Sequence, residues 1–237
     1  MPENSSGHTG IALDRGSTIT VADVQITGGA IGIRNSGQQV SLKNIYFKYC
    51  RTAYAGQGGW SVLFQKVTFE TCGLGIDITN PGNPGNLQGG IVLLDSTSIN
   101  SGTTIKFRES SPTAPKRNNQ IVIQNFKKDN QNPIAVTVDN VVKLGASSVV
   151  DTWTWGNAVP GQFQNGVSTT TTRVPALLAD DGTFFTMNAP TYAGYGLDQF
   201  INVKNVPGLP VNGDGVTDDG PSLNAILAQA AAACKIA

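Results

Sequence analysis

The sequence predicts an all-β fold, a right-handed, single-stranded parallel β-helix. Three observations predict it. Short apolar stretches recur about every 20 to 25 residues, apolar and polar side chains alternate within each stretch, and the composition is rich in glycine and poor in charge (28 Gly, 14% charged). Alternation is the period of a strand, and a strand-containing repeat of this length is typical of a solenoid. No Leu/Asn ladder supports a leucine-rich repeat.

The repeat is clearest in the segments 19–33, 40–54 and 60–78, and it continues in 91–107 and 121–138. When the first three are aligned, Ile26, Phe47 and Phe69 share one position. Seven residues later Ile33, Tyr54 and Ile76 share another. In a β-helix like residues stack at the strand spacing of roughly 4.8 Å. We therefore expect each set to form one file in the interior.

Cys50 and Cys72 each follow the aligned phenylalanine by three residues, so they should be neighbours on successive coils. A disulfide or a metal pair is one interpretation. Buried free thiols are favoured, because in-register neighbours seldom offer disulfide geometry and two cysteines without further ligands make a poor zinc site.

After residue 150 the repeat stops. We interpret residues 1–150 as β-helix coils and residues 151–205 as an irregular connector lying across the solenoid surface. A turn is expected at Asp181–Gly182.

Residues 206–237 begin with a turn and end with a helix. The turn residues Gly213, Asp214, Gly215, Asp218 and Asp219 precede Pro221, and apolar residues then follow helical spacing: Leu223, Ile226, Leu227, Ala230, Ala231 and Cys234. Pro and carboxylates suit a helix start, so we interpret the segment as a structural cap of a β-helix. A calcium site is the less favoured alternative, since few further ligands are evident.

Charge and hydropathy exclude several function classes. The formal net charge is zero and no aromatic-basic motif occurs, so no nucleic-acid partner is expected. No stretch has the roughly 18 apolar residues of a membrane helix, and the first residues lack the features of a signal peptide. The carboxylates Glu70 and Glu109 and the one histidine, His8, are expected to be solvated, and Glu3 lies in the terminal segment.

Several motifs occur in a characteristic order: "HTGIALD" (8–14), "CRTAY", "TCGLGIDI", "VVDTWTWGN" (149–157), "YAGYGLDQFINVK" (192–204) and "GDGVTDD". In this order they resemble the fungal exo-β-1,3-glucanases of glycoside hydrolase family 55, a branch of the pectate-lyase superfamily. The resemblance implies two β-helices joined by a connector. The chain would then hold the later coils of the first β-helix, the connector and the N-terminal cap of a truncated second one. It also implies a secreted protein without a cofactor.

Family 55 enzymes release glucose from the non-reducing end of β-1,3-glucan with inversion, by means of a Glu in the second β-helix. No catalytic residue is carried over, because that Glu is expected beyond this chain. No metal ligands are expected either. The candidate substrate-binding residues are Trp60, Gln57, Trp153 and Trp155, with packing aromatics as the alternative for each Trp. The family's "WxWGW" segment reads "GQGGW" here, with Gln57 and Gly58 in place of aromatics.

The expected partner is β-1,3-glucan or a related neutral polysaccharide. The chain alone is expected to be inactive and to self-associate through the open ends of its β-helix. A polysaccharide lyase or pectin-active β-helix is one alternative. A polyuronate site requires basic residues, so the neutral net charge argues against it. A non-catalytic carbohydrate-binding solenoid is the other.

Overall fold

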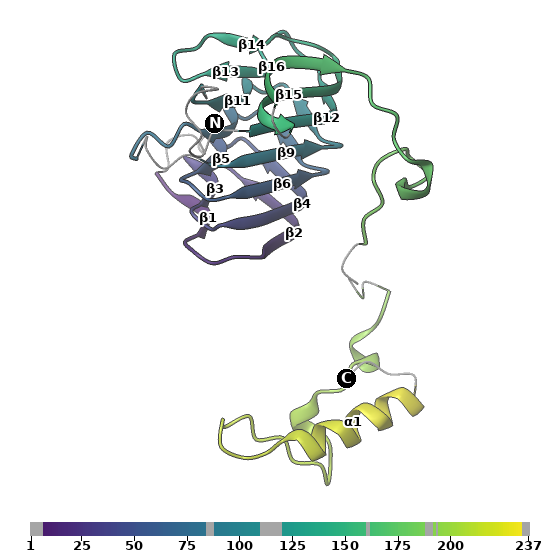
Figure 1. Ribbon diagram of the computed structural model, residues 1–237. Coiled ribbons are helices and arrows are strands. Elements are labelled where there is room, and N and C mark those ends of the chain that lie inside the picture. The colour runs from purple at the N-terminus through teal and green to yellow at the C-terminus, as the bar shows by residue number, and fades with distance from the viewer. Residues whose placement is uncertain are drawn as a thin grey trace. The chain divides into compact units, whose positions relative to one another are not determined.

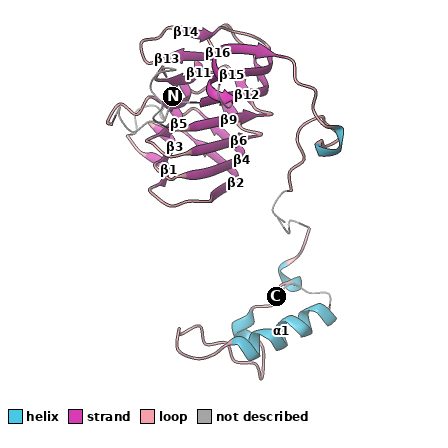
Figure 2. Cartoon of the chain, in the orientation of Figure 1, coloured by secondary structure: helices cyan, strands magenta, loops and turns pink. Residues whose placement is uncertain are grey.

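The computed structural model describes residues 7–83, 88–109, 120–159, 162–187, 192 and 194–233. The chain divides into two compact units, Met1–Asn188 and Ala189–Ala237. The first unit is built of stacked strands, and the second contains one α-helix, α1 (Figures 1 and 2).

One sheet of the first unit contains a strand from every coil. Its order is β1 (Thr9–Leu13), β3 (Ile31–Asn35), β5 (Thr52–Gly56), β8 (Leu74–Ile78), β11 (Thr103–Phe107), β13 (Ala135–Thr137) and β14 (Val142–Leu144). Neighbouring strands from β1 to β13 pair in parallel, and β14 pairs antiparallel with β13.

The second sheet faces the first across the core. It contains β2 (Ile19–Thr27), β4 (Gln39–Lys48), β6 (Ser61–Gln65), β7 (Thr68–Glu70), β9 (Gly90–Leu94), β10 (Thr97–Ile99), β12 (Gln120–Lys128), β15 (Val149–Val159) and β16 (Gln162–Thr169). The pairs β6–β7 and β9–β10 each correspond to one long strand such as β4, because β4 pairs in parallel with both β6 and β7. The predicted parallel β-helix is confirmed.

The predicted interior file is also confirmed. Ile26 is in register with Phe47, and Phe47 with Phe69. The two phenyl rings lie 5.8 Å apart with an interplanar angle of 5°, and both are fully buried. The second file, Ile33, Tyr54 and Ile76, is likewise in register. Successive coils therefore place like side chains over one another, which is the source of the continuous core.

The phenylalanine file does not continue as an apolar one. The next two positions are Ser98 and Lys128, which are in register with each other and with Phe69. Lys128 is only 3% exposed. Its ammonium group donates hydrogen bonds to the Ser98 hydroxyl (3.3 Å) and to the carbonyl oxygens of Ser101 (3.2 Å) and Gly102 (2.8 Å). These acceptors compensate for part of the cost of burying a charge.

This burial predicts a pH dependence of stability. Loss of hydration lowers the pKa of Lys128 to about 8, while Asp129 acts in the opposite direction. Between pH 8 and the ordinary value of 10.5 the unfolded chain binds more protons than the folded one. The contribution of Lys128 to the free energy of unfolding should therefore rise with pH in this window, by at most about 1.4 kcal/mol per pH unit.

Chemical denaturation at pH 7.5 to 9.5 checks this expectation, with Lys128→Met as the reference. The difference in unfolding free energy between the native chain and the variant should become more favourable to the native chain as pH rises. A difference that is flat over this range would contradict the assignment.

A column of residues in the left-handed (αL) backbone conformation bends the second sheet. Asp23, Asn44, Lys66, Asp95 and Asn125 occupy equivalent places in the five coils, with φ between +49° and +59°. Asn and Asp tolerate this conformation better than other non-glycine residues. Asn44 donates to Asp23 (2.7 Å), and Asn125 donates to Asp95 (2.6 Å). We call this column the αL corner.

Cys50 and Cys72 are buried free thiols on successive coils, as the sequence analysis favoured. The Cys50 thiol lies 3.3 Å from the carbonyl oxygen of Gly28, and the Cys72 thiol lies 3.6 Å from that of Phe47. The contact with Cys50, together with burial, raises the pKa of Cys72 above its ordinary value. The pair therefore packs as small apolar side chains rather than as a reactive site.

The interpretation of residues 151–205 as irregular is wrong for its first part. Chain direction reverses after β13, and β15 pairs antiparallel with β12, while β16 pairs antiparallel with β15. The alternation of Thr152, Trp153, Thr154 and Trp155 is a strand pattern, and Trp153 pairs with Ile123. This pattern does not belong to the coil repeat, so a search for the repeat alone misses it.

Residues 170–187, which we call the strap, lie against the second sheet. The expected turn at Asp181–Gly182 is present, with φ +75° at Gly182 and an isolated bridge between Leu178 and Phe184 on either side of it. A 3₁₀ helix, η2 (Pro175–Leu177), lies within the strap. Lys43 donates to the carbonyl oxygen of Met187, and Arg173 binds Asp95. The strap thus runs along the coils of the second sheet.

The second unit contains η3 (Leu197–Gln199), η4 (Val203–Asn205) and α1 (Gly220–Ala232). Ile226 and Ala230 are the buried residues of α1, and they belong to the predicted apolar face. The predicted Cys234 lies outside the described residues. No helix in the described ranges has the length and apolarity needed to cross a membrane.

The first coil is an edge. In the described part of the chain, β1 pairs with β3 and β2 pairs with β4, and neither has a partner on its other side. The core residues of this coil, among them Ile11, Leu13, Ile19, Val21 and Val24, are only partly buried. These features support the expected self-association, which stays a prediction that sedimentation of the chain would test.

Candidate functional site

Trp60 is presented by a glycine turn between β5 and β6. Gly58 and Gly59 have φ of +105° and +114°, backbone angles that residues other than glycine rarely adopt. The Trp60 N–H donates to the carbonyl oxygen of Gln38 (2.7 Å), and its carbonyl accepts from Gly90 (2.8 Å). The backbone is thus held from the coils on both sides, while 57% of the Trp60 residue surface is exposed.

Two glycines allow the neighbouring coils to approach closely at this turn. A Cβ atom on Gly59 would lie 2.4 Å from the carbonyl oxygen of Gly37, and one on Gly89 would lie 2.4 Å from that of Trp60. Larger residues would force the coils apart. Gly59 and Gly89 therefore allow a tight turn around one exposed ring.

Gln57 lies on the same turn. Its N–H donates to the carbonyl oxygen of Asn35 (2.7 Å), and its residue is exposed. It lines a cavity of about 130 Å³ on the outer face of the first sheet, together with Thr52, Asp77 and Asn80. The turn thus carries a polar residue, Gln57, and an aromatic residue, Trp60, three positions apart.

The interior beneath the turn is polar. Asn35 is fully buried, donates to the Tyr54 hydroxyl (2.8 Å) and accepts from the N–H of Gly37 (2.8 Å). Burial raises the pKa of Tyr54 above its ordinary value, so the phenol stays neutral. This buried hydrogen bond fixes the coil from which the turn departs.

Gln88 was missed by the sequence analysis. Its side chain is fully buried, and neither amide atom has a hydrogen-bond partner among the described residues. It lies under the turn, about 3.3 to 3.4 Å from where Cβ atoms of Gly56 and Gly59 would stand. No residue pattern signals this position, because Gln88 follows a Gly/Pro/Asn insertion rather than a repeat.

Trp153 and Trp155 do not present faces to a ligand. They are 0% and 1% exposed, and their rings stack on each other at 6.3 Å. Trp155 also packs edge-on against Phe107 at 5.3 Å. The interpretation of these two residues as substrate-binding is corrected, since β15 closes the last coil and turns both rings into the core. The packing alternative holds.

Glu70 and Glu109 are engaged in ion pairs, and Glu3 lies outside the described residues. Glu70 binds Lys48 at 2.8 Å, and Glu109 binds Lys143 at 2.5 Å. His8 is exposed. No group of three or more potential metal-ligating His, Cys, Asp or Glu side chains occurs within the described ranges. These residues form surface contacts and not a constellation for acid–base chemistry.

In the second unit the aspartates of the predicted cap bind backbone N–H groups. Asp214 accepts from Val216 (2.9 Å) and Thr217 (2.8 Å), and Asp219 accepts from Asn212 (2.9 Å) and Gly213 (2.7 Å). Asp218 accepts from Gly220 (2.9 Å). The N–H groups of Thr217 and Val216 lower the pKa of Asp214 to about 2. Gly213 and Gly215 have positive φ, which the tight turn requires. These backbone hydrogen bonds account for the clustering of the three carboxylates in the turn, so no metal ion is needed to explain it.

Comparison with known proteins agrees with this fold. Residues 1–77 match the family model "Rhamnogalacturonase A/epimerase, pectate lyase-like". A glucan 1,3-beta-glucosidase of Cochliobolus carbonum is 29% identical over 98% of this chain and 30% of its own length. The glucan endo-1,3-beta-glucosidase BGN13.1 of Trichoderma harzianum is 35% identical over 91% of this chain and 27% of its own length. The non-secreted LysM effector LysM19 of Penicillium expansum is 28% identical over 96% of this chain and 19% of its own length.

The strand topology defines a parallel β-helix protein, and residues 1–77 are similar to the pectate-lyase-like family. Within that class the chain is a relative of the fungal β-1,3-glucanases, so its resemblance to glycoside hydrolase family 55 is confirmed. It spans less than a third of the length of these relatives.

Proposed function

We propose that this chain contributes a glucan-binding surface to a secreted β-1,3-glucan hydrolase, with Trp60 as its aromatic platform. The exposed ring of Trp60 on a backbone held from two coils is the observation that carries the proposal. A rigid, exposed aromatic loses little entropy when a sugar ring packs on it, and Gln57 on the same turn can bind sugar hydroxyls.

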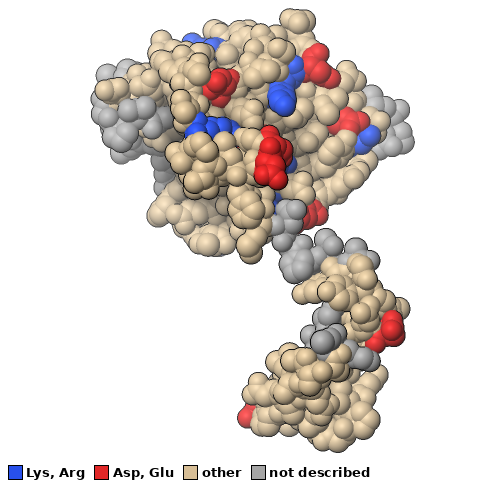
Figure 3. Space-filling model, turned by 90° about the vertical axis from the view of Figure 1, so that its right-hand side faces the viewer, with Lys and Arg blue, Asp and Glu red and all other residues tan. Residues whose placement is uncertain are grey.

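The surface charge supports a neutral ligand. On the face of the molecule shown in Figure 3, acidic and basic side chains form small scattered groups on a largely uncharged surface. A polyuronate would need a continuous basic surface, so the lyase alternative has less support. Release of products that absorb in the ultraviolet would favour the lyase.

We further propose that cleavage, with inversion, requires a carboxylic acid that this chain does not supply. Inverting glycosidases use two carboxyl groups roughly 6.5–9.5 Å apart, one of them with a raised pKa. Glu70 and Glu109 each bind a lysine on the surface. The chain alone should release no reducing sugar from laminarin, and release of glucose would overturn this part of the proposal.

Replacing Trp60 with alanine should weaken binding of laminari-oligosaccharides about tenfold, because an exposed aromatic anchor is typically worth more than 1 kcal/mol. Isothermal titration calorimetry with laminarihexaose measures the effect. Stability should change little, since the Trp60 side chain lies mainly in solvent.

The matched control is Phe185→Ala, which removes another aromatic residue that is 66% exposed. It should bind like the native chain. Equal affinity of Trp60→Ala and the native chain would exclude Trp60 as the platform.

A non-catalytic binding protein is the second candidate. The similarity to LysM19 favours it, because that relative is named an effector and not a glucosidase. Oligosaccharide binding by the chain, with no cleavage when the whole natural protein is assayed, would select this candidate.

A further inference from the structure

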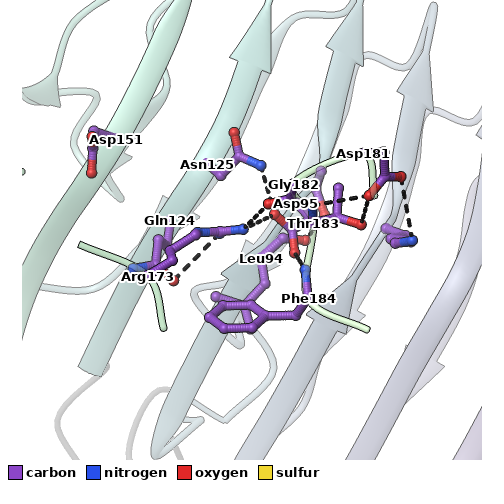
Figure 4. A network of polar contacts seen from close by, with 12 residues as sticks. Leu94, Asp95, Gln124, Asn125, Asp151, Arg173, Asp181, Gly182, Thr183 and Phe184 are labelled. Carbon is purple, nitrogen blue, oxygen red and sulfur yellow. Dashed lines mark hydrogen bonds and ion pairs between the residues drawn. The ribbon is translucent and has the colours of Figure 1, made fainter. Parts of the chain in front are cut away.

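A polar cavity lies between the strap and the last coils of the β-helix. Its volume is about 290 Å³, close to the lower end of the roughly 300–1,000 Å³ of ligand pockets. One wall comes from β12 and β15 and the other from the strap. The lining side chains are mainly polar: Asn125, Lys127, Asp151, Thr171, Arg173, Asp181 and Thr183. Figure 4 shows the network that holds the strap in place.

The walls of this cavity are preformed. Arg173 binds the fully buried carboxylate of Asp95 at 2.6 Å and donates to the carbonyl oxygen of Gly182 at 3.2 Å. At the other end of the strap wall, Asp151 accepts from the N–H of Thr171 (3.1 Å), and the hydroxyls of Thr152 and Thr171 are 2.9 Å apart. Strap and sheet are thus joined on two sides of the cavity, which lowers the cost of ordering the site on binding.

Several groups at the cavity retain hydrogen-bonding capacity within the described part of the chain. The side chain of Lys127 is exposed and makes no hydrogen bond or ion pair there. The second oxygen of Asp151 and the side-chain oxygen of Asn125 also lack a donor. One ammonium donor and two oxygen acceptors therefore remain for a ligand.

The charges identify the class of ligand. Two cations, Lys127 and Arg173, face two carboxylates, Asp151 and Asp181, so neither sign prevails. An anion would be repelled by the carboxylates and a cation by the lysine. A neutral ligand with several hydroxyl groups satisfies acceptors and donors alike, because each hydroxyl both donates and accepts.

We propose that this cavity is a second saccharide subsite, which takes one neutral sugar ring. It is separate from Trp60, which precedes β6, whereas the αL corner follows that strand. The five residues of β6 correspond to roughly 17 Å of strand. The choice of β-1,3-glucan as the source of the sugar rests on the proposed function, while the neutral polyhydroxyl chemistry rests on the cavity itself.

The test is a titration of the ¹⁵N-labelled chain with laminaribiose, glucose and glucuronate, followed by NMR. The backbone amides of Asp151, Thr171 and Thr183 should shift with the two neutral sugars and less with glucuronate. The indole N–H of Trp60 reports independently on the first site. Lys127→Ala should raise the dissociation constant at the cavity about tenfold, as expected for a lost hydrogen bond to a charged group. The matched control, Lys106→Ala, removes a lysine of the other sheet and should have no effect.

The outcomes separate the two proposals. Shifts at Trp60 without shifts at the cavity overturn the subsite and leave the proposed function standing. Cavity shifts with all neutral sugars but not at Trp60 support the subsite and count against the platform. Tighter binding of glucuronate than of glucose, or an unchanged affinity in Lys127→Ala, overturns the subsite as described.

Discussion

Replacing Phe69 with alanine should lower the free energy of unfolding by about 3–5 kcal/mol, the usual cost of removing a phenylalanine from a core. Phe69 is fully buried and stacks on Phe47 at 5.8 Å. Coils above and below are tied to it by backbone ladders, so the cavity left behind has little freedom to collapse. A loss of this size is a large part of the roughly 5–15 kcal/mol that stabilises a typical domain.

Chemical denaturation followed by circular dichroism measures this loss. Phe185→Ala is the matched control, because Phe185 is 66% exposed, and it should change stability by no more than about 0.5 kcal/mol. A loss below about 1 kcal/mol for Phe69→Ala would contradict a close-packed interior file. Phe69→Leu should fall between the native chain and the alanine variant.

Asp95→Ala should release the strap and cost about 3 kcal/mol, the order expected when one partner of a buried ion pair is removed. The Asp95 side chain is inaccessible to solvent and accepts from Arg173 (2.6 Å), from Asn125 (2.6 Å) and from the N–H of Phe184 (2.9 Å). Its removal leaves these donors without an acceptor. Arg173 also lies over the Phe184 ring at 4.4 Å, so both contacts should be lost together.

Amide hydrogen exchange locates the effect. In Asp95→Ala the amides of Phe184 and Gly182 should exchange faster, while those of the interior strands β4 and β6 keep their protection. Lys66→Met is the control, because it removes the exposed pair with Asp181 at 3.7 Å, which is worth less than about 1 kcal/mol. Unchanged protection of the strap in Asp95→Ala would show that this network does not hold it.

The coil repeat could be predicted from the sequence because its physical basis is local. Alternation marks the strands, and the spacing of 21 and 22 residues between Ile26, Phe47 and Phe69 marks the length of a coil. The insertions do not disturb the register, since β6, β9 and β12 on either side of them still pair in parallel. The turn and helix near Asp219 were likewise predictable, because an Asp/Gly turn forms within a few residues, where the carboxylates bind nearby N–H groups.

The rest depends on long-range contacts that no local pattern contains. Trp153 and Trp155 were interpreted as sugar platforms, but pairing of β15 with β12 buries both. Lys128 lies in the interior because its register with Ser98 places it there. From the sequence alone a lysine would be expected on the surface. The cavity at Asp151 arises from strap residues about 20 to 30 positions away in sequence. Of the predicted binding residues, Gln57 and Trp60 lie on the surface as expected.

A nuclear Overhauser experiment on the chain with selectively labelled phenylalanine and isoleucine tests the central claim most directly, namely that the coils stack one position over another. Cross-peaks should connect the rings of Phe47 and Phe69 and join Phe47 to the methyl groups of Ile26. Their absence in a folded sample, with assigned signals from all three side chains, would contradict the β-helix and with it the physical support for a glucan-binding surface.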